Sequence, residues 1–339
     1  MIWAALAGLL GTFALSGAVL GAALGLTGFL LLEFAVGGAM RLGVQSVWNT
    51  FNEFTLTAIP LFILLGEVLV ASGLAKRVFA ALSPLFSRAP GGLLHTNIAV
   101  CGVFGAVSGS SLSVAAAVGS VAYPELKRQG YDKRAVVGSL AGGGTLGLLI
   151  PPSLALLIFG ALTDTSIGRL FLAGVIPGIL TALLFMGWIL LHATRNPAIA
   201  PRGAWAGWRA VLAGLPQILP LVVLIVAVLG SLFAGLATPT EAAGVGVAAA
   251  VLLGATLGEL TLARFSAALL STARTFAVIA MVFVGALILA QAIALLGLPQ
   301  KLLHAIAEAG LSRWVLLLVV VLVYLVLGLF FDGLSMMIM

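Results

Sequence analysis

Apolar residues run along most of this chain in long blocks, which charged segments and clusters of glycine and proline separate. Several blocks reach the roughly 20 residues that a helix needs to cross a bilayer. None alternates at the two-residue period of a barrel strand. The pattern therefore predicts an all-α polytopic membrane protein. The expected spans are 2–17, 19–37, 48–71, 135–162, 168–192, 216–235, 240–257 and 273–296, with amphipathic stretches at 74–88 and 298–310 and long apolar blocks at 93–124 and 314–339.

One expected span contains a predicted break. The segment Ala141-Gly-Gly-Gly-Thr-Leu-Gly-Leu-Leu-Ile-Pro-Pro-Ser153 lies inside 135–162. Its prolines, Pro151 and Pro152, remove two amide donors and clash with the preceding turn. Its glycines are expected to loosen the backbone before the prolines. They stand at positions 142, 143, 144 and 147.

A broken helix in hydrocarbon needs a partner for its orphaned backbone groups, because each unsatisfied group costs several kcal/mol there. Freed carbonyls, together with the hydroxyls of Thr145 and Ser153, predict an oxygen cage for a small cation. Secondary transporters build ion sites near the middle of the membrane in this way. The alternative is a proline kink that holds no ligand.

The apolar block at 93–124 is too long for one simple span and carries a polar centre, Gly105-Ala-Val-Ser-Gly-Ser-Ser111. Both features predict a re-entrant helical hairpin with its tip at Ser108–Ser111, where backbone groups face a cavity. The alternative is a single tilted helix whose small residues pack closely against a neighbour.

An internal repeat with a shift of 224 positions supports the hairpin. The shift places Gly73-Leu74 on Gly297-Leu298, and Ser108–Ser111 on Asp332-Gly-Leu-Ser335. If the N-terminus is outside and 93–124 returns to its own side, twelve of the 16 Lys and Arg residues become cytoplasmic, as the positive-inside rule favours. The four expected outside are Arg41, Arg169, Lys301 and Arg313. The two hairpins then enter from opposite sides, which predicts an inverted repeat.

Composition agrees with a membrane protein. Of 339 residues, 62% are hydrophobic and only 8% are charged, with a mean hydropathy of +1.27, whereas soluble domains are roughly 25% charged. The net charge of +6 would suggest a nucleic-acid partner in a soluble chain. In this chain it indicates cytoplasmic loops beside the lipid bilayer, and no nucleic-acid partner is expected.

No catalytic arrangement is visible in the sequence. His95, His192 and His304 have no metal-ligand spacing. The chain also contains no His-Glu-x-x-His motif and no paired carboxylates within one span, so enzyme activity, a cofactor or a metal other than sodium is not expected. An intramembrane enzyme and another type of ion-coupled carrier or channel remain the alternatives to the interpretation that follows.

Four motifs in order resemble the large membrane subunit of tripartite ATP-independent periplasmic (TRAP) transporters, the DctM type. They are Ala58-Ile-Pro-Leu-Phe-Ile-Leu-Leu-Gly-Glu67, Phe104-Gly-Ala-Val-Ser-Gly-Ser-Ser111, Gly143-Gly-Thr-Leu-Gly-Leu-Leu-Ile-Pro-Pro-Ser153 and Ala237-Thr-Pro-Thr-Glu-Ala-Ala-Gly244. The resemblance runs along essentially the whole chain. It implies an elevator-type sodium symporter in the bacterial inner membrane. Its implied partners are a periplasmic substrate-binding protein, which delivers a dicarboxylate, keto acid, sugar acid or other small organic acid, and a small four-helix membrane subunit.

The two breaks and the resemblance together predict the site. Sodium is expected at Ser108, Gly109, Ser110, Ser111, Gly144, Thr145, Gly147 and Pro151. Substrate is expected at Ser111, Ser153, Asp332 and Ser335. The expected organisation is a first inverted repeat at 1–192, a cytoplasmic linker at 193–215 and an incomplete second repeat at 216–339.

The chain departs from the resembled family in two places. Val114 stands where many relatives carry a polar residue, so a substrate contact there is not carried over. Relatives also continue beyond the position of Met339 with a second Gly/Pro-broken span, so the chain is expected to be truncated at its C-terminus.

Two further carboxylates have competing interpretations. Glu67 lies near the end of its span, where it is either functional or paired with Lys76 or Arg77. Glu241 follows Thr238-Pro-Thr240, a pattern that predicts a helix cap.

Overall fold

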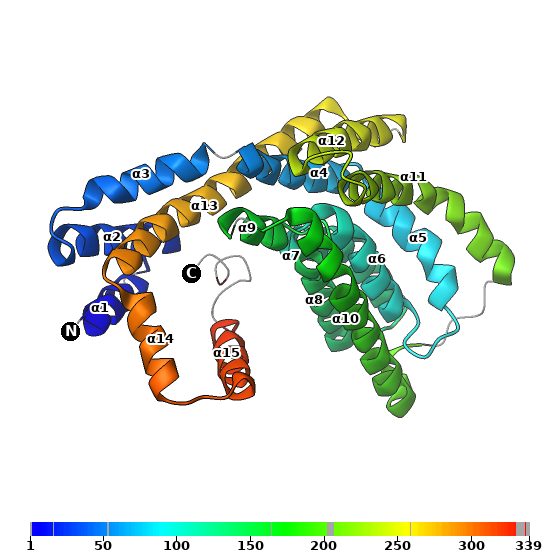
Figure 1. Cartoon of the computed structure of the whole chain (residues 1–339). Helices are drawn as coiled ribbons and strands as arrows, with labels where there is room; N and C mark the ends of the chain where they lie inside the picture. Colours follow the sequence, from blue (N-terminus) through cyan, green and yellow to red (C-terminus); the bar gives the residue numbers. More distant parts are fainter. Residues whose placement is uncertain are drawn as a thin grey trace. The chain divides into compact units, whose positions relative to one another are not determined.

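The computed structural model describes residues 2–15, 17–52, 54–163, 165–201, 207–257, 259–329 and 336 (Figure 1). Helices dominate these ranges, which contain no strand, so the predicted all-α class is confirmed. The chain packs into two compact units, Met1–Glu53 with Arg274–Met339, and Phe54–Ala273. The division into inverted repeats at 1–192 and 216–339 stays a prediction.

The first unit combines the N-terminal helices with the last part of the described chain. α13 begins in the second unit and ends in the first. The helices are α1 (Ile2–Leu15), α2 (Leu20–Leu30), the π-helix η1 (Leu31–Ala35), α3 (Met40–Phe51), α13 (Leu262–Leu295), α14 (Leu298–Glu308) and α15 (Arg313–Leu327).

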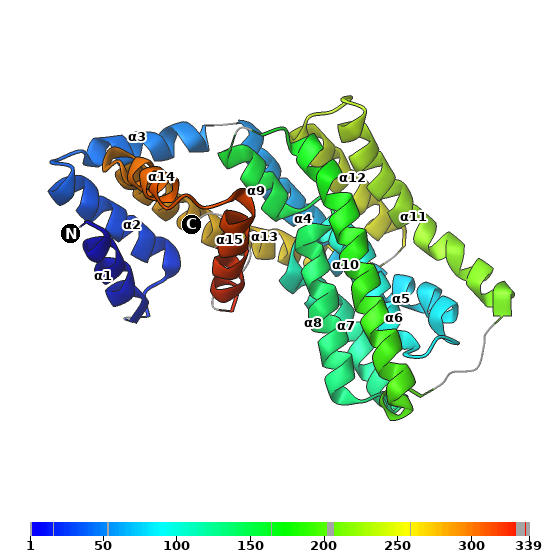
Figure 2. The same cartoon turned by 60° about the horizontal axis from the view of Figure 1, so that its bottom comes forward.

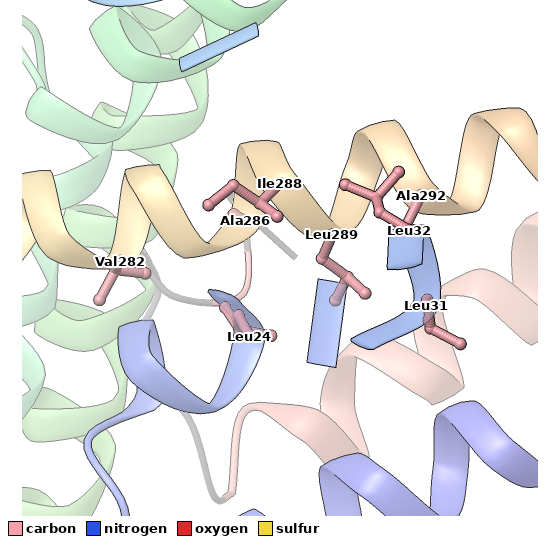
Figure 3. Close-up of a cluster of buried hydrophobic side chains, with 8 residues drawn as sticks. All are labelled: Leu24, Leu31, Leu32, Val282, Ala286, Ile288, Leu289 and Ala292. Atoms are coloured by element: carbon pink, nitrogen blue, oxygen red, sulfur yellow. The ribbon is translucent and has the colours of Figure 1, made fainter. Parts of the chain in front are cut away.

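In this unit α2 lies directly on α13, because small residues let the two backbones approach. A Cβ added at Gly21 would lie 2.5 Å from the Met281 carbonyl oxygen, and one at Gly28 would lie 2.6 Å from the Leu289 nitrogen. Apolar side chains of α2, η1 and α13 cluster beside these contacts (Figure 3). They are Leu24, Leu31, Leu32, Val282, Ala286, Ile288, Leu289 and Ala292.

The second unit contains both breaks that the sequence predicts. Its elements are the 3₁₀ turn η2 (Phe54–Thr57), α4 (Ala58–Ala71), α5 (Leu74–Phe86), α6 (Leu93–Ser108), α7 (Ser111–Arg128), α8 (Lys133–Leu149), α9 (Leu154–Leu162), α10 (Ile167–Arg195), the 3₁₀ turn η3 (Pro197–Ile199), α11 (Gly207–Phe233), α12 (Pro239–Thr256) and the start of α13. α6, α7, α8 and α10 lie side by side in both views (Figures 1 and 2).

The predicted span 48–71 is wrong. α3 ends at Phe51, and the 3₁₀ turn η2 precedes α4, so the predicted span is divided into the end of α3 and the whole of α4. Polar side chains before the turn form hydrogen bonds within α3. The Gln45 amide donates to Asn49 at 3.1 Å, and the Thr50 hydroxyl donates to the Ser46 carbonyl at 3.0 Å.

Several other boundaries also differ from the prediction. α10, α11 and α13 extend past the expected spans, and 19–37 divides into α2 and η1. Among the described residues, five helices are long and apolar enough to cross a membrane. α4 and α5, which meet at an angle of 69°, would make a sixth span if counted as one. Together these helices describe a multi-pass membrane protein.

The repeated glycine has the same conformation in both places. Gly73 (φ 71°) and Gly297 (φ 64°) are left-handed, and each precedes an amphipathic helix, α5 or α14. A left-handed residue costs glycine little, which accounts for the residue type at both positions. This local likeness agrees with the 224-residue shift, whereas the inversion of the repeats stays a prediction.

Candidate functional site

The hairpin 93–124 consists of two helices joined by a tight break. α6 ends at Ser108, Gly109 adopts φ 61°, and the extended Ser110 caps α7. The Gly109 amide donates to the Gly105 carbonyl at 3.1 Å, while the Ser113 amide donates to Ser110 Oγ at 3.4 Å. The predicted break at Ser108–Ser111 is therefore found, and a single continuous helix is not.

The predicted break in 135–162 lies at Ile150–Ser153, between α8 and α9. Pro151 has no amide to donate to the Gly147 carbonyl, as a continuing helix would. The hydroxyl of Ser153 donates to the Leu148 carbonyl, and Ser153 Oγ also accepts from the Leu156 amide at 3.4 Å. Ser153 thus caps α9 and satisfies one of the two carbonyls that the prolines leave.

The glycines of this segment do not loosen the backbone, contrary to the prediction. Gly142, Gly143, Gly144 and Gly147 all lie within the regular helix α8. Three of them allow the hairpin to approach α8. A Cβ at Gly143 would lie 2.9 Å from Cys101 Sγ, one at Gly144 would lie 2.9 Å from Ala115 Cβ, and one at Gly147 would lie 3.0 Å from the Ser110 carbonyl oxygen.

These close approaches bring the two breaks together. A Cβ added at Gly109 would lie 3.2 Å from the Pro152 carbonyl oxygen and 3.0 Å from the Leu154 amide nitrogen. On the other side of the tip, a Cβ at Gly66 would lie 2.7 Å from Ser108 Cα. The hairpin tip therefore lies against α4, the C-terminal turn of α8 and the α8–α9 break.

Two serine hydroxyls at this junction have no hydrogen-bond partner among the described residues. Ser108 Oγ and Ser111 Oγ are both inaccessible to solvent, and Ser108 as a whole is 3% exposed. A buried polar atom without a partner is costly, so each such atom calls for an explanation. Hydroxyl and backbone carbonyl oxygens are the kind of ligands that small cations bind in transporters.

Not every predicted residue reaches this junction. Thr145 is exposed, and its hydroxyl donates to the Gly142 carbonyl of its own helix at 2.7 Å. Asp332 and Ser335 lie outside the described residues. The junction therefore contains Ser108–Ser111 and Gly144, with Gly147 and Pro151–Ser153.

Glu67 has a contact that the sequence did not predict. Its Oε1 accepts a hydrogen bond of 3.3 Å from the Ser113 hydroxyl, one turn after the hairpin tip. The expected pairing with Lys76 or Arg77 is wrong, because Arg77 Nε instead contacts Glu259 Oε1 at 3.2 Å. Glu67 and Ser113 are 46 positions apart, so sequence spacing gives no signal for this contact.

Glu241 acts as the predicted helix cap. The Thr238 amide donates to Glu241 Oε2 at 2.8 Å, and the Glu241 amide donates to Thr238 Oγ1 at 3.3 Å. This reciprocal pair is a capping box at the start of α12. Glu241 therefore stabilises the N-terminus of α12.

The base of the hairpin is closed by Tyr131, in the loop between α7 and α8. The Leu93 amide, at the start of α6, donates to the Tyr131 hydroxyl at 3.1 Å. Burial raises the pKa of the Tyr131 phenol, and the hydrogen bond from Leu93 partly opposes the shift. The loop thus fixes the start of one arm to the end of the other.

The described residues contain no group of three or more His, Cys, Asp or Glu side chains that could hold a metal ion. The polar atoms at the hairpin junction include serine hydroxyls and backbone carbonyls. Weakly bound alkali cations suit such neutral ligands better than transition metals, which favour imidazole and thiolate.

Known proteins resemble this chain along most of its length. Residues 7–339 match the family model "Tripartite ATP-independent periplasmic transporter, DctM component". The C4-dicarboxylate TRAP transporter large permease protein DctM of Pseudomonas aeruginosa is 34% identical over 91% of this chain and 72% of that protein. The sialic acid TRAP transporter large permease protein SiaM of Vibrio cholerae is 32% identical over 92% and 72%.

A third relative is named for a different substrate. The ectoine/5-hydroxyectoine TRAP transporter large permease protein UehC of Ruegeria pomeroyi is 31% identical over 90% of this chain and 71% of that protein. All three relatives are named as transporter permeases and none as an enzyme. With a family model that covers nearly every residue, these likenesses show that the chain belongs to the DctM family of large TRAP transporter permeases.

Proposed function

We propose that this chain is the large membrane subunit of a sodium-coupled importer of a small organic acid. The observation that carries the proposal is the pair of buried hydroxyls, Ser108 Oγ and Ser111 Oγ, which have no hydrogen-bond partner in the described part of the chain and lie at the junction with the α8–α9 break. A sodium ion there would satisfy both hydroxyl oxygens. It would also satisfy the Gly147 carbonyl, which has no amide donor in the next turn because residue 151 is a proline.

The relatives support the proposed substrate class and partners. The relatives' names include a C4-dicarboxylate and sialic acid, which are organic acids. A third relative is named for ectoine. Because the relatives' names differ in substrate, we propose only the class of small organic acids and no single compound. We assign the organic acid to Ser111 and Ser153, together with Asp332 and Ser335, beside the sodium. A periplasmic binding protein would deliver the acid, and a small four-helix subunit would complete the complex in the bacterial inner membrane.

Binding next to the hairpin tip would couple the two ligands, because each would fill part of one junction. We propose that the junction moves as a unit across the bilayer in an elevator mechanism. The dense packing between the hairpin and α8 supports this view, since Gly105, Gly143 and Gly147 hold the helices in close contact.

Uptake by the assembled transporter tests the proposal. Gly144→Val would push a side chain toward Ala115 Cβ and the Ser111 carbonyl oxygen, which lie 2.9 and 3.1 Å from an added Cβ. We expect sodium-dependent uptake to be lost while membrane insertion persists. Gly138→Val is the matched control, because a Cβ at Gly138 in the same helix meets nothing within 4 Å. Normal sodium dependence in the Gly144 variant would contradict the proposal.

A further inference from the structure

A basic cavity lies along α7, past the hairpin tip. Its volume is about 550 Å³, and its walls come from the end of α4, the start of α5, α7, the segment between α12 and α13, and the start of α13. We define this basic cavity by the lining residues Gly73, Lys76, Ala117, Ser120, Glu259 and Arg264.

The charges of the basic cavity do not balance. Its one carboxylate, Glu259, is already engaged by Arg77 Nε at 3.2 Å. Arg264 donates to the Glu259 backbone carbonyl at 2.7 Å, a contact that leaves its positive charge uncompensated. Lys76 is exposed and makes no side-chain hydrogen bond or ion pair within the described ranges. The cavity therefore carries an excess of positive charge.

The walls of the cavity strengthen the effect of these charges. Val70 and Val121 also line it, and apolar walls focus the field of nearby cations and raise the local concentration of anions. Lys76, Ser120 and Arg264 are exposed, so water and salt reach the cavity and screen part of its charge. A solvent-accessible pocket lined by two cations, whose carboxylate is already paired, is suited to a small anion.

One face of α7 connects the cavity to the hairpin tip. Ser113, Ala117 and Ser120 are spaced four and three residues apart, which places them on the same side of the helix. Ser113 contacts Glu67 near the tip, whereas Ala117 and Ser120 line the cavity. From Ser110 to Ser120 the helix rises about 15 Å.

We infer that the basic cavity is an anion-binding vestibule, which the organic acid occupies between the hairpin tip and the side of the membrane predicted to be cytoplasmic. The identity of the occupant as a small carboxylic acid rests on the proposed function. Lys76 and Arg264 attract the anion, and Ser120 lies along its path.

The charge of the vestibule can be measured without transport. In a Cys101→Ala background, Ser120→Cys places a single thiol in the cavity. The purified full chain, in nanodiscs of zwitterionic lipid, is labelled with anionic sulfonatoethyl methanethiosulfonate or cationic trimethylammonioethyl methanethiosulfonate. Each rate is divided by the rate of the same reagent with free cysteine. We expect the anionic reagent to be favoured, and Lys76→Gln with Arg264→Gln to reduce this preference about fivefold or more.

Lys127→Gln with Lys133→Gln is the matched control. It removes the same amount of charge from exposed positions that do not line the cavity, and should leave the preference unchanged. The anionic reagent could be equally preferred in the Ser120→Cys protein, in its Lys76→Gln with Arg264→Gln variant and in the control variant. That result would overturn the inferred anion attraction.

Succinate, pyruvate and gluconate, added separately, test the occupant. We expect at least one of them to slow labelling of the thiol introduced by Ser120→Cys, and protection by none would overturn occupancy by an organic acid. Because labelling requires no sodium gradient, a transporter that labels as predicted but takes up nothing would count against the proposed function alone.

Discussion

Ser108 and Ser111 carry the strongest residue-level signal in this protein. Both belong to the polar centre of an apolar block, which is why the sequence alone singles them out. Their orphaned hydroxyls could not be predicted, because that property depends on which neighbours surround them in space. Thr145 shows the converse, since it looks equally suitable in the sequence but bonds to its own helix.

Removing an orphaned buried hydroxyl should not lower the stability of the protein, whereas removing a hydrogen-bonded one should. Without sodium, Ser108→Ala removes a polar atom that has no partner among the residues the structure describes, so we expect the protein to keep its stability or gain about 1 kcal/mol. Thermal denaturation in sodium-free buffer, with potassium as the only alkali cation, measures this. Ser139→Ala is the control, since the Ser139 hydroxyl accepts from Asn97 at 2.8 Å and its removal should be destabilising. A clear loss of stability in Ser108→Ala would mean that its hydroxyl has a partner in the sodium-free protein.

At the scale of elements, the sequence predicts the positions of both breaks but misreads the glycines beside one of them. Proline breaks a helix for covalent reasons, so Pro151 and Pro152 give a reliable local signal. Glycine either frees a backbone or admits a neighbouring helix, and only the neighbour decides between them. Gly144 and Gly147 face the hairpin and remain helical. The contact of Glu67 with Ser113 was missed for the same reason.

The closure of the hairpin by Tyr131 predicts both a mutational effect and a pH effect. Tyr131→Phe removes the acceptor for the buried Leu93 amide, which should cost about 1 kcal/mol. Burial raises the pKa of this phenol in the folded state. The associated stability is therefore complete below the ordinary tyrosine pKa of about 10 and is lost as the pH rises above it.

Thermal denaturation of the wild type and Tyr131→Phe across alkaline pH checks this prediction. The difference in midpoint should be largest near neutral pH and shrink above about pH 10. A difference that grows with alkaline pH would show that the ionised phenol is the more stable form in the folded protein.

At the scale of the whole molecule, composition and hydrophobic blocks were sufficient to predict an all-α multi-pass protein. Span boundaries were less predictable. Polar residues at 45–52 interrupt one apolar block, and α13 extends from a segment that looked like a loop. Hydropathy measures the tendency to enter a membrane, whereas the start and end of a helix depend on local hydrogen bonds and on packing.

The positive-inside pattern predicts that both ends of the hairpin lie on the cytoplasmic side. In a background without Cys101, single cysteines that replace Arg88 or Lys127 should resist a membrane-impermeant thiol reagent added outside intact cells. A cysteine that replaces Lys301, predicted to be periplasmic, should react and provides the positive control. Reaction at only one of the first two positions would show that 93–124 crosses the membrane.

The most direct test of the account is equilibrium binding of radioactive sodium to the purified chain in nanodiscs. The account predicts saturable binding that potassium does not displace, and its loss when Ser108→Ala and Ser111→Ala are combined. Ser120→Ala is the control on α7, because its hydroxyl donates to its own helix at the Ala117 carbonyl and lies away from the tip. Undiminished sodium binding by the double variant would contradict the assignment of the ion to the hairpin junction.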